Sequence, residues 1–220
     1  MNVKAIFWDF GGVITTSPFE GFARYEKAEN LPQGFIRKVN SINPDANAWA
    51  RFERSEIDRD GFIAAFEEEA LMMGHAVSGE AILAGLMGEP RPMMVRALER
   101  VKETFQIACL TNNVARMQRR PEQEAEIERI MGLFSHVIES SKIRSRKPEK
   151  RFYKHALEMV GVDADEAVFL DDLGVNLKAA REMGMATIKV VEPEKALKDL
   201  GRIINMDLGA DQCSESQLDE

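Results

Sequence analysis

The sequence is poor in the residues from which disulfide frameworks and soft-metal sites are built. Its 220 residues include two cysteines and three histidines. Cys109 lies in an apolar run and Cys213 in a polar stretch, so we expect neither a disulfide framework nor a cysteine-based zinc site. His75, His136 and His155 form no HxH or HxxxH pattern, and we interpret them as structural residues. Such sparing use of cysteine is typical of a reducing compartment.

Positive charge and long hydrophobic runs are also scarce. Lys and Arg number 29 against 37 Asp and Glu, which gives a formal net charge of −8. This sign disfavours a protein that binds a phosphate backbone. No stretch reaches the roughly 18 apolar residues of a transmembrane helix, and no signal-peptide pattern precedes the first apolar run. We therefore expect a cytoplasmic monomer or homodimer that binds neither nucleic acid nor membrane.

What the sequence does contain is an alternation of short apolar runs with helical patterns. The runs are too short for helices and are apolar throughout, which is typical of strands buried on both faces of a parallel sheet. They span residues 3–8, 106–110, 136–138, 167–170 and 186–191. Helical periodicity occupies the intervening stretches 91–104, 149–160 and 175–183. The alternation predicts an α/β fold, a Rossmann-like doubly wound parallel sheet with right-handed crossovers.

One interval breaks this alternation. Residues 16–90 separate the first two expected strands, whereas a βαβ crossover needs only about a dozen residues. The interval has helical patterns, with Asp58 as one helix N-cap, and we interpret it as an inserted helical domain. The core then comprises 1–15 and 91–204, and the polar stretch 205–220 is expected to be a mobile acidic tail. The alternative is that some inserted helices pack directly on the sheet as part of one core.

Polar side chains follow the expected strands at the edge where open α/β sheets bind their ligands. They are, in chain order, Asp9, Thr111, Lys147, and the pair Asp171 and Asp172. Carboxylates at adjacent strand ends repel one another unless a cation lies between them, and oxygen ligands alone indicate a hard ion such as Mg²⁺. Because Mg²⁺ is usually shared with phosphate oxygens, a small phosphorylated substrate is expected.

In such a site each of these residues has a chemical role. Asp9 can attack phosphorus as a nucleophile, Thr111 can hydrogen-bond the transferred phosphoryl group, and Lys147 can neutralise its charge. Gly11 and Gly12 would let backbone amides approach closely. Taken singly, each residue also has a structural explanation, as a helix cap, a turn residue or a solvated charge. The order Asp, Thr, Lys-Pro, Asp-Asp along the chain is what favours a catalytic site.

Four stretches resemble the motifs of the haloacid dehalogenase superfamily. FWDFGGVI resembles its first motif, CLTNN its second, SRKPEKRFY its third and VFLDDLGVNLKAAREMGM its fourth. The likeness covers nearly the whole chain, and residues 16–90 correspond to the C1-type cap of subfamily I. The chain most resembles the branch with the N-terminal phosphatase domain of soluble epoxide hydrolase and the related domain of acyl-CoA dehydrogenase fusions, without the epoxide hydrolase domain itself. This resemblance implies a Mg²⁺-dependent phosphatase for a small phosphate monoester.

The resemblance also implies a metal site. Asp9 would be both the nucleophile and a Mg²⁺ ligand. The backbone oxygen of Gly11 and the carboxylate of Asp172 would be further ligands. Asp171 and Asn176 would support these ligands from behind.

By the same resemblance, the phosphoryl group would be bound by Thr111, the backbone amide of Asn112, and Lys147. One position departs from the family pattern. Most of its phosphatases carry a second Asp two positions after the nucleophile, and here that residue is Gly11. The general acid and base is therefore missing, and losing such a group costs about 10² to 10⁴ in rate. We expect a phosphatase of low or specialised activity, which uses water, a cap residue or the substrate itself, or is restricted to good leaving groups.

Other functions fit parts of the pattern. A regulator that binds a phosphorylated or otherwise anionic metabolite with little turnover would also lack the acid. A metal-independent 2-haloacid dehalogenase shares the nucleophile, but it leaves the pair Asp171 and Asp172 unexplained. Phosphorelay receiver domains carry their paired acids at the first strand, the reverse of the order here. The substrate is set largely by the cap, whose aromatic residues we interpret mainly as its own core: Phe19, Phe22, Trp49, Phe52, Phe62 and Phe66.

Overall fold

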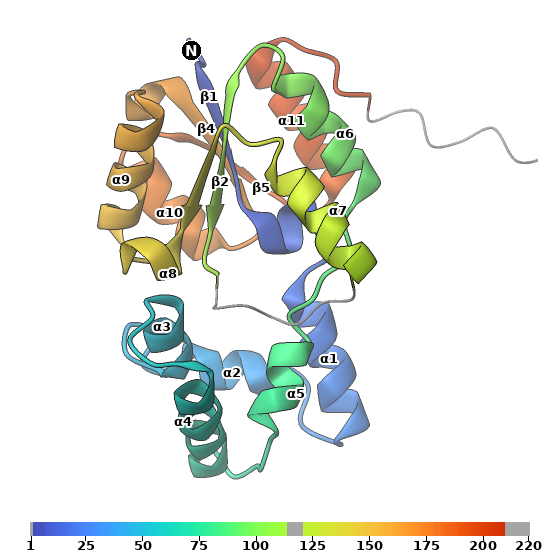
Figure 1. Cartoon of the computed structure of the whole chain (residues 1–220), viewed down its shortest axis with the longest axis vertical. Coiled ribbons are helices and arrows are strands. Elements are labelled where there is room, and N and C mark those ends of the chain that lie inside the picture. Colours follow the sequence, from blue (N-terminus) through green and yellow to red (C-terminus); the bar gives the residue numbers. More distant parts are fainter. Residues whose placement is uncertain (1, 114–120, 210–220) are drawn as a thin grey trace, which may run out of the picture.

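The computed structural model describes residues 2–113 and 121–209. Their centre is a sheet of five parallel strands in the order β3-β2-β1-β4-β5 (Figure 1). The strands are β1 (Ala5–Trp8), β2 (Gln106–Thr111), β3 (His136–Glu139), β4 (Ala167–Asp171) and β5 (Ala186–Lys189). All of the expected strands are present, and the predicted doubly wound α/β fold is confirmed. The chain builds the sheet outward from β1 in one direction and then in the other.

Hydrophobic side chains cover both faces of this sheet because successive residues of a strand point to opposite sides. In β1, Ile6 and Trp8 belong to one buried cluster, whereas Ala5 and Phe7 belong to the other. Helices on the first face are α6 (Pro92–Val101), α7 (Pro121–Met131) and α11 (Pro193–Ile204), and those on the second are α9 (Lys150–Val160) and α10 (Gly174–Glu182). Figure 1 shows the two sets on opposite sides of the sheet. Two short elements, α8 (Ser140–Ile143) and the turn η2 (Ala164–Glu166), complete the core.

The interval between β1 and α6 forms a helical unit beyond the carboxyl edge of the sheet (Figure 1). Its members, called the inserted helices below, are α1 (Pro18–Ala28), α2 (Phe35–Ser41), α3 (Ala48–Glu53), α4 (Arg59–Met72) and α5 (Gly79–Ala84). Asp58 caps α4 as expected, since its carboxylate accepts a hydrogen bond from the Gly61 amide at 2.9 Å.

The inserted helices enclose a hydrophobic cluster of their own. The Phe62 ring stacks on Phe52 with centroids 4.8 Å apart and lies 4.6 Å from the Trp49 ring. Phe22 and Phe66 are also buried there, and Phe19 packs against the cluster from its margin. The aromatic residues are therefore core residues, as the sequence indicated, rather than the lining of a pocket.

Two chain segments connect the inserted helices to the sheet, and they run side by side. The Thr16 amide donates to the Glu89 carbonyl at 2.9 Å, and the Arg91 amide donates to the Ile14 carbonyl at 2.8 Å. The chain thus leaves the core and returns to it at one point.

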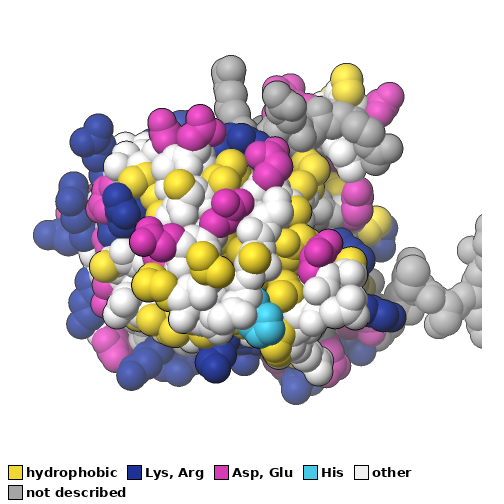
Figure 2. Space-filling model, turned by 90° about the horizontal axis from the view of Figure 1, so that it is seen from below, with side chains coloured by type: hydrophobic (Ala, Val, Ile, Leu, Met, Phe, Trp, Pro, Cys, Tyr) yellow, Lys and Arg dark blue, Asp and Glu magenta, His cyan; other side chains and the backbone are white. Residues whose placement is uncertain are grey.

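The outer face of the inserted helices mixes hydrophobic with acidic side chains, and Lys and Arg lie mainly around its margin (Figure 2).

The chain after α11 differs from the expected tail. Leu208 is buried in the same cluster as α11, Met206 packs against it, and the Met206 amide donates to the Gly201 carbonyl at 2.9 Å. Met206 and Leu208 therefore pack against the core, whereas Asn205, Asp207 and Gly209 are exposed. The rest of the expected tail, 210–220, lies outside the described residues. Among the helices that the structure describes, none combines the length and apolarity needed to cross a bilayer.

Candidate active site

Three carboxylates meet at the carboxyl edge of the sheet. Asp9 follows β1 directly, Asp171 is the last residue of β4, and Asp172 is the next. The pairing of β1 with β4 brings them together, and the Asp9 amide donates to the Leu170 carbonyl at 2.8 Å. One carboxylate oxygen from each of the three acids lies within 4.8 Å of the others. The sequence placed these acids at one edge, and the structure brings them into one cluster.

Lys147 lies between two of these acids. Its ammonium group contacts an oxygen of Asp9 at 2.8 Å and an oxygen of Asp171 at 2.8 Å, and the residue is 1% exposed. It belongs to the loop between α8 and α9. This lysine is therefore not part of a solvated basic surface, whereas Lys142 of the same stretch is exposed and pairs with Glu139.

Asp171 uses both of its oxygens within the protein. Oδ1 accepts hydrogen bonds from the Leu173 amide at 2.7 Å and from Asn176 Nδ2 at 3.1 Å. Oδ2 accepts from Lys147 at 2.8 Å and from Asn176 at 3.0 Å. A carboxylate with this many donors has little capacity left for an ion. Asp171 and Asn176 are thus buried and hydrogen-bonded to each other, and Asp171 also binds the Lys147 ammonium group.

Burial shifts the pKa values of this cluster. Burial raises the pKa of Asp9 to about 8, the Lys147 ammonium opposes this rise, and Asp171 and Asp172 add to it. Burial and the neighbouring Asp171 raise the pKa of Asp172 to about 6. Burial lowers the pKa of Lys147, but Asp171 and Asp9 outweigh it and keep this pKa above its ordinary value. The fully ionised cluster therefore requires more positive charge than Lys147 alone provides.

The donor set fits a hard divalent cation. Asp172 forms no ion pair with any described residue, and its Oδ2 accepts a hydrogen bond from the Ser17 hydroxyl at 3.4 Å. Asp9 and Asp172 together offer carboxylate oxygens in a site without sulfur or imidazole ligands, which is the chemistry that Mg²⁺ prefers. Gly12 lies directly against the Asp172 carboxylate, because a Cβ at position 12 would be 2.3 Å from Asp172 Oδ2. Only glycine therefore leaves space for this carboxylate.

The two glycines after Asp9, Gly11 and Gly12, differ in backbone conformation and in the space around them. Both lie in η1 (Phe10–Ile14), a wide turn closed by the Thr15 amide on the Phe10 carbonyl at 3.0 Å. Gly12 has φ +81°, a conformation that favours glycine. Gly11 has φ −71° and ψ 126°, and a Cβ there would make only ordinary contacts, 3.7 Å from Pro18. Position 11 therefore has a backbone conformation that other residues adopt, and a Cβ fits there without a close contact.

Thr111 is the last residue of β2 and Asn112 follows it; β2 pairs with β1, which Asp9 follows. The Asn112 side chain makes two hydrogen bonds to the backbone of Lys147. Its Nδ2 donates to the Lys147 carbonyl at 2.9 Å, and its Oδ1 accepts from the Lys147 amide at 2.8 Å. The resemblance assigned a role to the backbone amide of Asn112, but it did not anticipate that its side chain fixes the lysine backbone.

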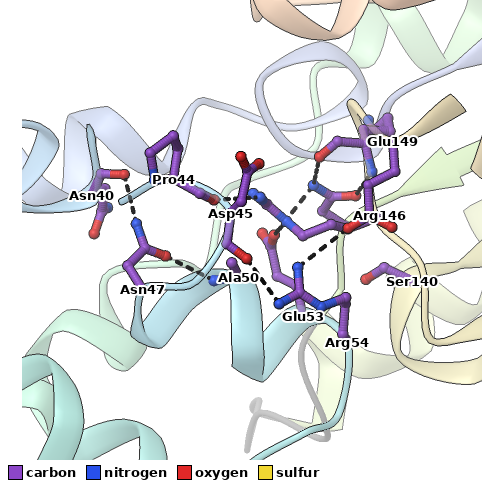
Figure 3. Close-up of polar contacts among 12 residues, drawn as sticks. Asn40, Pro44, Asp45, Asn47, Ala50, Glu53, Arg54, Ser140, Arg146 and Glu149 are labelled. Atoms are coloured by element: carbon purple, nitrogen blue, oxygen red, sulfur yellow. Dashed lines mark hydrogen bonds and ion pairs between the residues drawn. The ribbon is translucent and has the colours of Figure 1, made fainter. Parts of the chain in front are cut away.

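A residue of the inserted helices also reaches this site. Glu53, at the end of α3, accepts a hydrogen bond from Asn112 Nδ2 at 3.2 Å. It also pairs with Arg146 (Figure 3). Burial raises the pKa of Glu53, and Arg146 opposes that rise. Glu53 could not be predicted from the sequence, because no local pattern links it to partners 59 and 93 positions away.

A sequence profile described as "Hydrolase: haloacid dehalogenase-like hydrolase" matches residues 3–184, and so covers every residue of this site. The chain belongs to the haloacid dehalogenase-like hydrolases. Both relatives suggested by the motifs are among the similar curated proteins. Mouse acyl-CoA dehydrogenase family member 10 is 30% identical over 94% of this chain, and pig bifunctional epoxide hydrolase 2 is 29% identical over 94%. The chain spans only 20% and 40% of their respective lengths.

Solved structures of this hydrolase family share the fold. A haloacid dehalogenase family enzyme of Bacteroides thetaiotaomicron, crystallised with magnesium and inorganic phosphate, aligns with a TM-score of 0.56 at 21% identity. The alignment covers 85% of this chain and 93% of that one. A predicted hydrolase of the same family from Porphyromonas gingivalis aligns with a TM-score of 0.66 at 16% identity, over 94% and 100% of the two chains. This chain therefore shares its overall fold with both structures.

Proposed function

We propose that this hydrolase is a Mg²⁺-dependent phosphatase that acts on a small phosphate monoester through an aspartyl-phosphate at Asp9. The observation that carries the proposal is the cluster of Asp9, Asp171 and Asp172, whose three carboxylates are paired among the described residues with only one ammonium group, that of Lys147. The Bacteroides enzyme of the same family, which was crystallised with magnesium and inorganic phosphate, supports the proposal of this chemistry. The assignments of the individual residues follow from their contacts.

Asp9 and Asp172 would hold the metal, together with the backbone oxygen of Gly11. Bound there, Mg²⁺ would neutralise the carboxylates and withdraw charge from the phosphoryl oxygens. Asp171 is saturated by hydrogen bonds, so with Asn176 it would orient Lys147 and the ligands rather than bind the ion.

The phosphoryl group would lie between Asp9 and the end of β2. There Thr111 and the backbone amide of Asn112 would donate hydrogen bonds to its oxygens, and Lys147 would compensate its negative charge. A carboxylate oxygen of Asp9 forms a bond to phosphorus while the ester P–O bond breaks, and the leaving oxygen takes a proton from water. A water molecule then attacks the phosphorus of the aspartyl-phosphate, which releases inorganic phosphate and restores Asp9.

Gly11 sets the expected activity. The side chain that would protonate the leaving group is missing, although a Cβ fits at position 11. Substrates whose leaving group departs without a proton, such as acyl or anomeric phosphates, are therefore favoured, and alkyl phosphates should react slowly. The same observation favours a second candidate function, a cytoplasmic regulator that binds a phosphorylated metabolite with little turnover.

The experiment is a panel of phosphate esters and acyl phosphates with and without Mg²⁺, read as phosphate release. Wild type should release phosphate only with Mg²⁺, and Asp9→Asn should abolish that release because the amide is a poor nucleophile. Retained activity in Asp9→Asn would exclude the nucleophile role. Calorimetric binding of panel members without any turnover would favour the regulator, and chloride release from 2-chloropropionate without metal would favour a dehalogenase.

A further inference from the structure

The end of α3 contacts the loop that carries Lys147 through two neighbouring residues (Figure 3). Glu53 pairs with Arg146, and Arg54 pairs with Glu149 at 3.2 Å. Glu53 and Arg146 are both largely enclosed, with side chains 14% and 16% exposed. Both pairs join the inserted helices to the core, so each one contributes to holding the two parts together.

The two pairs differ in what else they touch. Oδ1 and Nδ2 of Asn112 bind the backbone of Lys147, and the same Nδ2 also donates to Glu53 at 3.2 Å. Glu53 Oε2 accepts from Arg146 as well. One carboxylate oxygen therefore contacts both Asn112 and the residue that precedes Lys147. A continuous series of contacts leads from Glu53 through Asn112 and Lys147 to Asp9.

Arg54 makes none of these contacts. Its other partners are the carboxylate of Glu56 and the carbonyl of Asp45 at 3.0 Å, both in the inserted helices and their loops. Its core partner Glu149 also accepts from the Ser145 hydroxyl at 2.8 Å. Loss of Arg54 would weaken the contact between the two parts of the molecule without releasing Asn112.

We propose that Glu53 is a positioning residue for the phosphate site, supplied by the inserted helices, which orients Asn112 and thereby the backbone of Lys147. The inference rests on the proposed phosphatase function, in which the Asn112 amide and the Lys147 ammonium contact the phosphoryl group. A hydrogen bond to a charged group restrains its partner more strongly than a neutral one. The inserted helices thus complete the site as well as cover it.

Three variants distinguish a role of Glu53 in orienting Asn112 from a role in holding the inserted helices against the core. Glu53→Ala removes the acceptor for both Asn112 and Arg146. Glu53→Gln keeps an oxygen that accepts from Asn112 but removes the charge facing Arg146. Arg54→Gln is the matched control, because it breaks a contact between the same two parts of the molecule on the adjacent residue.

The first measurement is binding of inorganic phosphate by calorimetry with saturating Mg²⁺. We expect the dissociation constant to rise about tenfold in Glu53→Ala and about threefold in Glu53→Gln, as one hydrogen bond to a charged group predicts. It should stay at the wild-type value in Arg54→Gln. Mg²⁺ affinity should be unchanged in all three, because Glu53 contacts neither Asp9 nor Asp172. If Glu53→Ala does not fold, the threefold rise in Glu53→Gln carries the test.

The second measurement is hydrogen exchange of the Lys147 amide, which donates to Asn112 Oδ1. Exchange should be faster in Glu53→Ala than in wild type and unchanged in Arg54→Gln. The proposal would be overturned if Glu53→Ala and Arg54→Gln changed phosphate binding and Lys147 amide exchange equally. It would also be overturned if neither Glu53 variant changed them. A wild-type protein that binds no phosphate with Mg²⁺ would instead refute the proposed function, and the exchange rates alone would then decide whether Glu53 orients the lysine backbone.

Discussion

The substitution Gly11→Asp tests whether one missing side chain limits this enzyme. The backbone at Gly11 has φ −71° and ψ 126°, values that any residue adopts. A Cβ there would lie 3.7 Å from both Cδ and Cγ of Pro18, which is ordinary van der Waals contact, so the Cβ itself displaces no neighbour. We therefore expect no steric cost at the Cβ, and we expect bound Mg²⁺ to offset the repulsion between the new carboxylate and Asp9. The variant should report on chemistry rather than on folding.

The expected gain can be stated for each class of substrate. A positioned general acid contributes about 10² to 10⁴ in rate, which corresponds to about 2.7 to 5.4 kcal/mol of barrier. The gain should appear with an alkyl phosphate, whose alkoxide leaves only after protonation. It should be small with an aryl or acyl phosphate, whose leaving group is stable as an anion. The ratio of alkyl to aryl turnover is therefore more informative than either rate alone.

The assay is Mg²⁺-dependent phosphate release from the two ester classes, with Gly11→Asn as the control. Asparagine matches aspartate in size but donates no acidic proton, so it should leave the ratio at the wild-type value. The double variant Asp9→Asn, Gly11→Asp should be inactive, which ties any gain to the proposed nucleophile. A folded, Mg²⁺-binding Gly11→Asp protein with no gain on the alkyl phosphate would refute the reasoning.

Two further predictions concern the metal site. Gly12→Ala should destabilise the protein by about 1 to 3 kcal/mol in urea unfolding, because φ at this position is +81°. It should also weaken Mg²⁺ binding, because the new Cβ would lie 2.3 Å from Asp172 Oδ2. A variant with wild-type Mg²⁺ affinity would contradict this prediction. Without metal, stability should fall as the pH rises from the ordinary Asp pKa of 3.8 toward about 8, because burial raises the pKa of Asp9 and the folded state retains protons that the unfolded state has lost. Mg²⁺ binds the ionised carboxylates, so it should raise the melting temperature more at about pH 8 than at about pH 5; an equal shift at both would show that the acids are not its ligands.

The fold and the principal acids could be predicted because they depend on local patterns. Buried strands of a parallel sheet are apolar on both faces, so short continuous runs such as 106–110 identify them. The carboxyl ends of parallel strands share one edge, so Asp9, Asp171 and Asp172 were expected at one site before any distance was known. The N-cap at Asp58 could also be predicted, because a helix cap depends only on residues that are close in sequence.

Contacts between distant segments could not be predicted in the same way. The sequence does not reveal that Asp171 is saturated, because its donors become apparent only when Lys147 and Asn176 lie against it. Gly11 and Gly12 look alike in the sequence, yet only Gly12 faces Asp172 at a positive φ. The buried Leu208 also reads as part of a polar tail until α11 is in place.

The sequence by itself thus determined the sheet, the inserted helices as a separate run, the family motifs and the missing acid at Gly11. These features depend on residue order and on short-range periodicity. Only the tertiary structure decided which carboxylate forms no ion pair with a described residue, at which glycine a Cβ fits without a close contact, and that Glu53 reaches Asn112. The physical reason is that hydrogen bonds and burial depend on distances between segments, and those distances exist only once the inserted helices have packed against the edge of the sheet.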